Sequence, residues 1–226
     1  MEQKPLLEFE HQVWTSGDIR IAGLDEAGRG PLAGPVVAAA LVFDRKYLEK
    51  ESAGIFLNLN DSKRLTERQR EFFFDLPTDN PFVEIGIGIS HAAEIDTVNI
   101  LKATHLAMSR ALANLPAVPD HILVDGLPVP GLSAPSTPIV RGDSKSYSIA
   151  AASIIAKVTR DKWMISYDKR YPEYGFKNHK GYGTSRHIQA LLKYGPTPEH
   201  RKTFAPVKDM QGIRGNIEKN PSCEAI

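Results

Sequence analysis

Short runs of apolar residues alternate with polar stretches along most of the chain, and their spacing predicts strands. Two early runs, rich in Ile, Val and Ala, are separated by a glycine-rich connection that would let neighbouring strands pair. Two later runs are short, and the last of them ends in an acid followed by glycine. Strands are therefore expected at 19–25, 35–43, 82–89 and 121–125.

Helical periodicity occupies the longer segments between and after these runs. Thr66 with Gln69 three residues later has the pattern of a capping box, and Thr184 is a suitable N-cap for a helix that closes at Gly195. The longest helical segment begins after Gly142-Asp143 and has a small, apolar first half, which is typical of a helix packed closely on a sheet. Helices are expected at 66–76, 90–115 in two pieces, 144–171 and 184–194, and this order of elements predicts an α/β fold.

The composition is typical of one large globular domain. Of 226 residues, 42% are hydrophobic and 24% charged. No apolar run reaches the roughly 18 residues of a membrane span, and the first residues lack the apolar core of a signal peptide. We expect a cytoplasmic protein with a main domain over 1–205, including a C-terminal helical region, and a flexible tail over 206–226. The single cysteine, Cys223, excludes an internal disulfide and a cysteine-based zinc site, so oxygen atoms would hold any metal.

Positive charge is concentrated in one segment. Between Lys157 and Thr203, eleven Lys or Arg stand against four acids, so this segment carries +7 and the rest of the chain −6. The segment also holds seven aromatic residues, a mixture that suits phosphate contacts and stacking on sugars or bases. A helix with a solvated basic face and an aromatic stripe turned to the core would show the same pattern, so both interpretations stay open.

Four acids stand where the expected elements would bring them to one edge of the sheet. Asp25 and Glu26 end the first strand, Asp125 ends the fourth, and Asp161 lies toward the outer end of the long helix. If the two strands are neighbours, their ends lie about 5 Å apart, within reach of a shared cation. Oxygen ligands suit Mg²⁺ or Mn²⁺, and two such ions would stabilise the attacking and leaving oxygens of a phosphodiester displacement. Ordinary solvated acids in turns are the alternative.

Five longer motifs follow one another along the chain. They are Asp25-Glu26-Ala27-Gly28-Arg29-Gly30-Pro31-Leu32-Ala33-Gly34-Pro35; Asn60-Asp61-Ser62-Lys63 with Leu65-Thr66; Val124-Asp125-Gly126; Gly142-Asp143 leading to 148–161; and His179-Lys180-Gly181-Tyr182-Gly183-Thr184 with Gly195-Pro196 and His200-Arg201. Together they resemble ribonuclease HII, the type 2 ribonuclease H of bacteria, over about 21–204. One motif alone could arise by chance, but five in this order would not.

The resemblance implies a ribonuclease H-like fold, with a mixed five-stranded sheet flanked by helices and a C-terminal helical extension. It implies that Asp25, Glu26, Asp125 and Asp161 are the catalytic, metal-binding acids, holding two Mg²⁺ or Mn²⁺ ions during catalysis. Asp25 would bridge the ions and Asp161 would help hold the one that orients the attacking water. The implied activity is cleavage of RNA in RNA/DNA hybrids and on the 5′ side of single ribonucleotides in duplex DNA, leaving 3′-hydroxyl and 5′-phosphate ends. Ribonucleotide removal and primer processing during DNA replication and repair are the implied roles.

The resemblance also implies which residues contact the substrate. The Gly28-Arg29-Gly30 turn would read the 2′-hydroxyl with its backbone, and Tyr182 would contact the same hydroxyl and stack on the next deoxyribose. Weaker candidates for phosphate contacts are Lys63, Lys145, Lys180 and Arg186. We expect a monomer without a membrane partner, and a possible sliding-clamp contact through the tail, where Arg214 and Lys219 lie.

Several alternatives stay open. His179, His187 and His200 have no spacing typical of a zinc site, so loop or capping roles are expected for them. Asp143 is either the N-cap of the long helix or an outer partner of the metal site. Three competing functions are a ribonuclease HIII, a catalytically inactive hybrid-binding module, and a transposase- or resolvase-like nuclease. A ribonuclease HIII normally carries a large N-terminal domain, whereas about 18 residues precede the first expected strand here.

Overall fold

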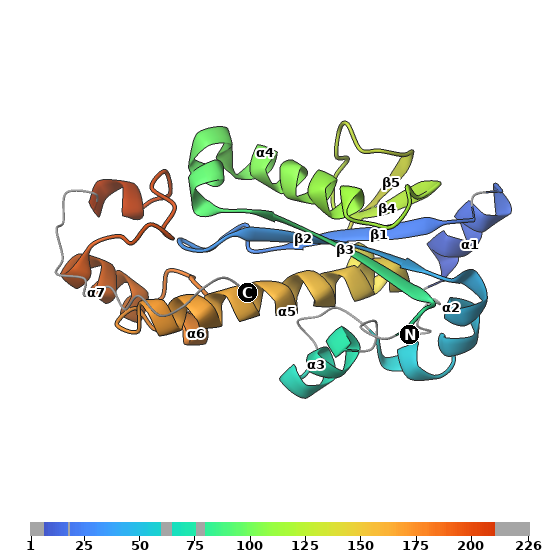
Figure 1. Ribbon diagram of the computed structural model, residues 1–226, viewed down its shortest axis with the longest axis horizontal. Coiled ribbons are helices and arrows are strands. Elements are labelled where there is room, and N and C mark those ends of the chain that lie inside the picture. The colour runs from blue at the N-terminus through green and yellow to red at the C-terminus, as the bar shows by residue number, and fades with distance from the viewer. Residues whose placement is uncertain (1–6, 18, 60–64, 76–79, 211–226) are drawn as a thin grey trace. The chain divides into compact units, whose positions relative to one another are not determined.

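The computed structural model describes residues 7–17, 19–59, 65–75 and 80–210 (Figure 1). The chain forms two compact units. The first comprises Met1–Ala27, Val37–Ile89 and His105–Val158, and the second comprises Gly28–Val36, Ser90–Thr104 and Thr159–Ile226. The Asn60-Asp61-Ser62-Lys63 motif and the tail from residue 211 lie outside the described residues.

Strands and helices alternate along the chain, as the apolar pattern predicts. The strands are β1 Ile21–Ala27, β2 Val36–Phe43, β3 Val83–Ser90, β4 His121–Asp125 and β5 Ser136–Ile139. The α-helices are α1 Glu8–Thr15, α2 Arg45–Glu51, α3 Glu67–Asp75, α4 Ala92–Ala113, α5 Tyr147–Arg170, α6 Phe176–His179 and α7 Ser185–Tyr194. Short 3₁₀ turns are η1 Ile55–Asn58, η2 Gly142–Ser144 and η3 Val207–Met210.

The strands form one mixed sheet in the order β3-β2-β1-β4-β5. β1 is antiparallel to β2 and parallel to β4, and β4 is parallel to β5. β1 lies at the centre of the sheet, and its residues from Ile21 to Asp25 are buried, because an apolar strand in this position is covered on both faces. The predicted α/β class and five-stranded sheet are confirmed.

Close packing in the first unit depends on glycines. A Cβ on Gly23 of β1 would lie 2.1 Å from the carbonyl carbon of Ser148 in α5, and a Cβ on Gly88 of β3 would lie 1.9 Å from the carbonyl oxygen of Ala107 in α4. No side chain tolerates contacts this short, so only glycine lets the two backbones approach so closely. The first half of α5 and the second half of α4 thus cover opposite faces of the sheet (Figure 1).

The predicted strands agree with the structure to within two residues, but the sequence pattern missed the helices α1, α2 and α6 and the strand β5. The first strand continues to Ala27, so that Asp25 lies inside β1 and not just after it. β5 is a four-residue edge strand that contains Pro138, which is tolerated there because a sheet edge does not need every amide.

Helix ends follow the predicted caps, with one correction. The Gln69 amide donates to Thr66 Oγ1 and the Thr66 amide to Gln69 Oε1, which is the capping box before α3. Asn99 interrupts α4 with a φ of 70°, in agreement with the two predicted pieces. The prediction of Asp143 as a possible N-cap of the long helix is wrong, because α5 begins only at Tyr147 and Ser146 Oγ accepts the amide of Ile149 instead.

The second unit has its own core. Aromatic and aliphatic side chains from 163–210 pack around Leu32 and Met164, the latter fully buried. Thr184 Oγ1 accepts the His187 amide and Gly195 closes α7, as predicted. η3 adds the fully buried Val207 to this core, and the expected division of the chain after residue 205 stays a prediction.

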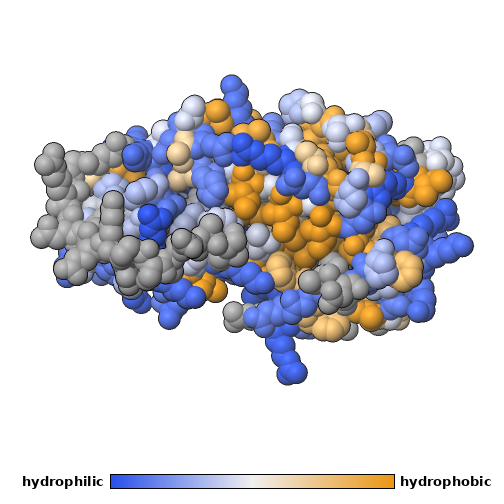
Figure 2. All heavy atoms as spheres, in the orientation of Figure 1, coloured by the Kyte–Doolittle hydropathy of each residue, from blue (hydrophilic) through white to orange (hydrophobic). Residues whose placement is uncertain are grey.

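One face of the first unit exposes apolar side chains. They gather over β3, an edge strand of the sheet (Figure 2). A hollow of about 390 Å³ on this unit is lined by Phe74, Ile85, Ile87, Asn114 and Ile155. None of the helices in the described ranges is both long enough and apolar enough to cross a bilayer.

Candidate active site

The register of the sheet brings two of the predicted acids to the same edge. β1 and β4 run parallel with Leu24 opposite Val124, so the next residue on each strand, Asp25 and Asp125, ends up at the same level. Neighbouring strands lie about 5 Å apart, which places the two carboxylates beside each other. Glu26 follows on β1 and is half-buried.

Backbone amides hold both carboxylates in place. The Glu26 amide donates to Asp25 Oδ1 at 2.6 Å, and the Gly142 amide donates to Asp125 Oδ1 at 2.6 Å. A hydrogen bond with Ser153 of α5 also favours the charged form of Asp25. Neither Gly142 nor Ser153 was predicted as a partner, because a sequence gives no sign of an amide or hydroxyl that meets an acid only after folding.

Burial and like charge act against the ionised form of Asp25. Its side chain is 5% exposed. Burial raises its pKa well above the ordinary value, and the charges of Glu26 and Asp125 raise it further. The hydrogen bonds from Ser153 and Glu26 do not offset these effects.

The carboxylates of Asp25, Glu26 and Asp125, all in the first unit, are of the ligand type that suits a divalent cation. A cation would neutralise the repulsion that raises the pKa of Asp25, and carboxylate oxygens are what Mg²⁺ and Mn²⁺ prefer. Among the described residues, no three His, Cys, Asp or Glu side chains are grouped closely enough to form a metal site by themselves. Asp161 is half-buried in the second unit, so a four-acid site stays a prediction.

In the second unit, the Gly28-Arg29-Gly30 turn lies beside Tyr182. A Cβ on Gly30 would lie 3.6 Å from Tyr182 Cε1, so the ring and the turn are neighbours. Gly28 has a φ of +97°, and a Cβ there would lie 2.0 Å from Arg160 Nε. Tyr182 is 52% exposed, and Arg29 and Gly30 are exposed as well. The fold therefore brings together the glycine turn and Tyr182, the two parts of the chain that were predicted to contact the 2′-hydroxyl.

The other aromatic residues of the basic segment mostly build the core. Tyr167, Tyr171, Tyr174 and Phe176 are buried, and Trp163 and Tyr194 are half-buried. The interpretation as a core-facing aromatic stripe is thus correct for them. Tyr182 differs because its ring lies at the surface, where a base or a sugar could stack on it.

Two buried histidines, His187 and His200, form a hydrogen-bond network that ends on the backbone of Tyr182. The amide of Thr197 donates to His200 Nδ1 at 2.9 Å, so Nε2 of His200 carries the proton and donates to His187 Nε2, also at 2.9 Å. His187 Nδ1 then donates to the Tyr182 carbonyl at 2.9 Å. The His179 ring stacks on His187 with centroids 4.5 Å apart.

Burial keeps this network neutral. It lowers the pKa of His187 to about 4 and that of His200 to about 3, with the charge of the neighbouring histidine adding to the effect in His200. The predicted loop and capping roles suit these contacts, in which His187 and His200 link the loop at Tyr182 to the turn at Thr197.

The predicted phosphate-binding residues have local contacts. Lys145 Nζ donates to the Val140 carbonyl at 2.7 Å, and Lys180 Nζ to the Lys177 carbonyl at 2.5 Å. The guanidinium of the exposed Arg186 lies over Gly175. Lys63 lies outside the described residues. Phosphate binding by these four residues stays a prediction.

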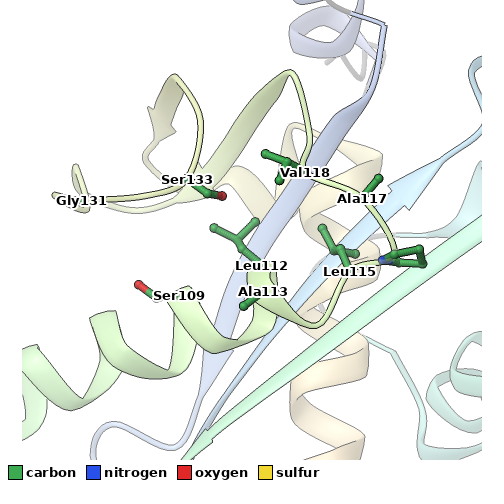
Figure 3. A pocket seen from close by; sticks show the side chains of 9 residues that line it. Ser109, Leu112, Ala113, Leu115, Ala117, Val118, Gly131 and Ser133 are labelled. Carbon is green, nitrogen blue, oxygen red and sulfur yellow. The ribbon is translucent and has the colours of Figure 1, made fainter.

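A cavity of about 410 Å³ lies elsewhere in the first unit (Figure 3). Leu112, Leu115 and Val118 line it near the end of α4, together with Ser133 from the segment before β5. No residue of the predicted site lines this cavity.

Comparisons with known proteins agree on one family. The sequence model of the family described as ribonuclease HII matches residues 22–207. The ribonuclease HII of Geobacillus thermodenitrificans (strain NG80-2) is 50% identical over 210 residues, which are 92% of this chain and 77% of that protein. The solved ribonuclease H2 from Pyrococcus horikoshii OT3 has a TM-score of 0.70 at 30% identity, covering 85% of this chain and 97% of that one. Bst ribonuclease HIII, solved in complex with Mn²⁺, has a TM-score of 0.67 at 20% identity over 92% of this chain and 73% of that one, a likeness of fold alone.

Proposed function

The chain belongs to the ribonuclease HII family, the type 2 ribonucleases H that cleave RNA in RNA/DNA hybrids, and from this premise we propose that it also cuts duplex DNA on the 5′ side of a single embedded ribonucleotide. The observation that carries the proposal is the exposed Tyr182 ring beside the Gly28-Arg29-Gly30 turn. One ribonucleotide in DNA differs from its neighbours only by its 2′-hydroxyl, so a compact reader of that group is needed. A turn with two glycines lets backbone donors approach a sugar closely, and the ring offers a stacking surface.

Hydrolysis is assigned to Asp25, Glu26, Asp125 and Asp161, as ligands of two Mg²⁺ or Mn²⁺ ions. The ions, when bound, would activate water and stabilise the leaving oxygen to give 3′-hydroxyl and 5′-phosphate ends. The raised pKa of Asp25 supports the assignment, because crowded carboxylates favour a cation between them. A fold neighbour solved with Mn²⁺ is consistent with it. Within the chain, the amides of Glu26 and Gly142 fix the direction of the two carboxylates.

The proposal also covers the phosphate contacts, the oligomeric state and the cellular role. Lys145, Lys180, Arg186 and Lys63 would contact phosphates around the scissile bond. The enzyme would act as a monomer in the cytoplasm, removing ribonucleotides and processing primers during DNA replication and repair. A sliding-clamp contact through the C-terminal tail stays a prediction, since the tail from residue 211 lies outside the described residues.

The decisive experiment is digestion of a duplex with one ribonucleotide, mapped at nucleotide resolution in Mg²⁺, in Mn²⁺ and in EDTA. We expect one cut immediately 5′ of the ribonucleotide with either ion and none in EDTA. Cutting elsewhere, or no cutting while long hybrids are cleaved, would contradict the proposal. Binding of long hybrids without cleavage in any metal would instead indicate an inactive hybrid-binding module.

A variant pair tests the tyrosine. Tyr182→Ala should lower kcat/KM on the single-ribonucleotide duplex by roughly tenfold or more beyond its effect on long hybrids, because stacking on one base is worth about 1–3 kcal/mol. Tyr182→Phe keeps the ring and should recover most of the loss that is due to stacking. Equal losses on both substrates would count against a role in reading the single ribonucleotide.

A further inference from the structure

Two arginines are buried beneath the Gly28–Gly30 turn. Arg201 is 0% exposed and Arg160 is 2% exposed, which is unusual for a side chain that carries a charge. In the described part of the chain, the hydrogen bonds of both guanidiniums end on main-chain carbonyl oxygens. Their burial is thus explained by contacts with the chain itself, which replace the hydration of the guanidinium groups.

Arg201 binds the turn directly. Its Nη1 donates to the carbonyl of Arg29 at 2.8 Å, and its Nη2 donates to the carbonyl of Gly28. Nε and Nη2 also donate to the carbonyl of Gly34, at 3.1 and 3.0 Å. One planar guanidinium therefore connects both ends of the loop that contains the turn, a task for which the ammonium of lysine lacks the fixed fork of donors.

Arg160 holds the rest of the same loop. It donates to the carbonyls of Ala33 at 3.1 Å and Pro35 at 3.0 Å, and to that of Lys180, two residues before Tyr182, at 3.0 Å. The Leu32 amide donates to the Gly181 carbonyl at 2.8 Å, which ties the loop to the same segment. Arg160 thus joins the glycine turn to the segment that carries Tyr182.

The direction of these carbonyls fixes the direction of the amides. In a planar trans peptide, the carbonyl of one residue and the N–H of the next point in opposite directions. Because Arg201 draws the carbonyls of Gly28 and Arg29 inward, the amides of Arg29 and Gly30 point away from the buried arginine. Arg29 and Gly30 are exposed, so these amides face the open side of the turn.

Charge adds to geometry. Both guanidiniums are charged, because arginine is not deprotonated in proteins. Two cations below outward-facing amides favour an oxygen ligand on the open side.

We propose that Arg201, assisted by Arg160, is a positioning residue for recognition of the ribonucleotide: it holds the Gly28 and Arg29 carbonyls so that the amides of Arg29 and Gly30 face the 2′-hydroxyl. The inference rests on the proposed function and names residues that contact no substrate themselves. Arg201→Lys would keep the charge but release part of the loop. Discrimination between ribose and deoxyribose should then fall while the fold persists.

The test measures binding, so that it does not depend on cleavage. Affinities of the full chain are measured in EDTA for a duplex with one ribonucleotide and for the same duplex entirely of DNA, and their ratio is the discrimination. For Arg201→Lys the ratio should fall about tenfold toward one, as expected when a buried network that orients donors is broken. Arg170→Lys is the matched control, because Arg170 pairs with Glu199 at the surface and should leave the ratio unchanged.

Folding is checked by circular dichroism and thermal unfolding. If Arg201→Lys does not fold, Arg160→Lys tests the same idea, with a smaller drop in the ratio because Arg160 does not contact the Gly28 or Arg29 carbonyl. A folded Arg201→Lys, or a folded Arg160→Lys in its place, with the wild-type ratio would overturn the inference and leave the proposed function intact. A wild-type ratio of one would overturn the inference, and the mapped digestion of the single-ribonucleotide duplex would decide the proposed function separately.

Discussion

The acids near the ends of β1 and β4 and the arginines below the Gly28–Gly30 turn both hold charge out of water, but their neighbours differ. Carbonyl oxygens surround Arg160 and Arg201, whereas Asp25 meets other carboxylates that raise its pKa. The repulsion from Glu26 and Asp125 disfavours the ionised form of Asp25, and a cation would relieve it. Under the proposed function, buried arginines hold the Gly28–Gly30 turn in one conformation before substrate binds, whereas the acids would need bound cations to complete their site.

The largest expected effect breaks the acid edge. Asp25→Asn should lower cleavage of long hybrids in Mg²⁺ by roughly 10³-fold, a loss typical of removing a group that stabilises charge in the transition state. Hybrid binding should remain measurable. Near-full activity of the variant would contradict the assignment of Asp25 as a metal ligand.

The same variant should be more stable without metal. Since folding raises the pKa of Asp25, its folded state binds the proton more tightly, and its contribution to stability falls as the pH rises above the ordinary range of an aspartate. Thermal unfolding in EDTA at pH 8 should therefore show Asp25→Asn melting a few degrees above the wild type. Mg²⁺ should raise the melting temperature of the wild type but hardly that of the variant. Glu49→Gln, at an exposed ion pair with Arg45, is the control and should change neither result.

The acid edge could be predicted from the sequence because it follows from strand geometry. Asp25 and Asp125 lie at or near the ends of short apolar strands, and two parallel neighbours bring such residues to one level. The edge strand β5 could not be predicted in the same way, since its four residues include a proline and no apolar alternation. Helix α1 was missed because its mixed polar pattern has only a few apolar positions, of which Val13 and Trp14 are buried.

The contacts that hold the Gly28–Gly30 turn could not be predicted from the sequence. Arginine is usually exposed, and the sequence pattern gives no sign that Arg160 and Arg201 will be buried on carbonyls. The motifs around Tyr182 and His200 could indicate that these segments matter, but not that His187 joins them. Contacts between residues far apart along the chain decide both networks, and periodicity reports only local structure.

The next effect tests the neutral histidine network, which responds to pH in the opposite sense from Asp25. Folding lowers the pKa of His187 to about 4. Its contribution is complete above about pH 6.5, the ordinary value for histidine, and is lost as the pH falls toward 4, by on the order of 3 kcal/mol. His200, lowered to about 3, acts in the same direction and is coupled to His187.

Urea unfolding at a series of pH values measures this effect. The free energy of unfolding of the wild type should decline between pH 6.5 and 4, and His187→Gln should decline less steeply by about one proton. His105→Gln, outside the network, is the matched control and should keep the wild-type slope. Parallel curves for the wild type and His187→Gln would show that the network is not held neutral by the fold.

The smallest expected effect concerns Glu10, a buried acid of the first unit that accepts hydrogen bonds from one hydroxyl and one amide. Its Oε1 accepts from Ser146 Oγ at 2.6 Å and from the Ser148 amide at 3.0 Å, at the start of α5. Burial nevertheless raises its pKa, so its charged form is held at a cost that grows above pH 4.5. Glu10→Gln keeps an acceptor oxygen and removes the charge, and should stabilise the protein by on the order of 1 kcal/mol at pH 8. That gain should vanish in acid, where Glu10 is protonated in both the folded and the unfolded protein.

Glu10→Ala separates the two contributions, because it removes both the charge and the acceptor at the helix N-terminus. It should be less stable than Glu10→Gln by about 1 kcal/mol, the usual value of an N-terminal cap. Urea unfolding of both variants at pH 8 and pH 4 measures the difference. If Glu10→Gln were destabilising at pH 8, the hydrogen bonds at the start of α5 would stabilise the charged form of Glu10. Hydrogen bonds alone would then be enough to stabilise a buried carboxylate in this unit. The need for cations at Asp25 would then follow from the crowding of carboxylates and not from burial.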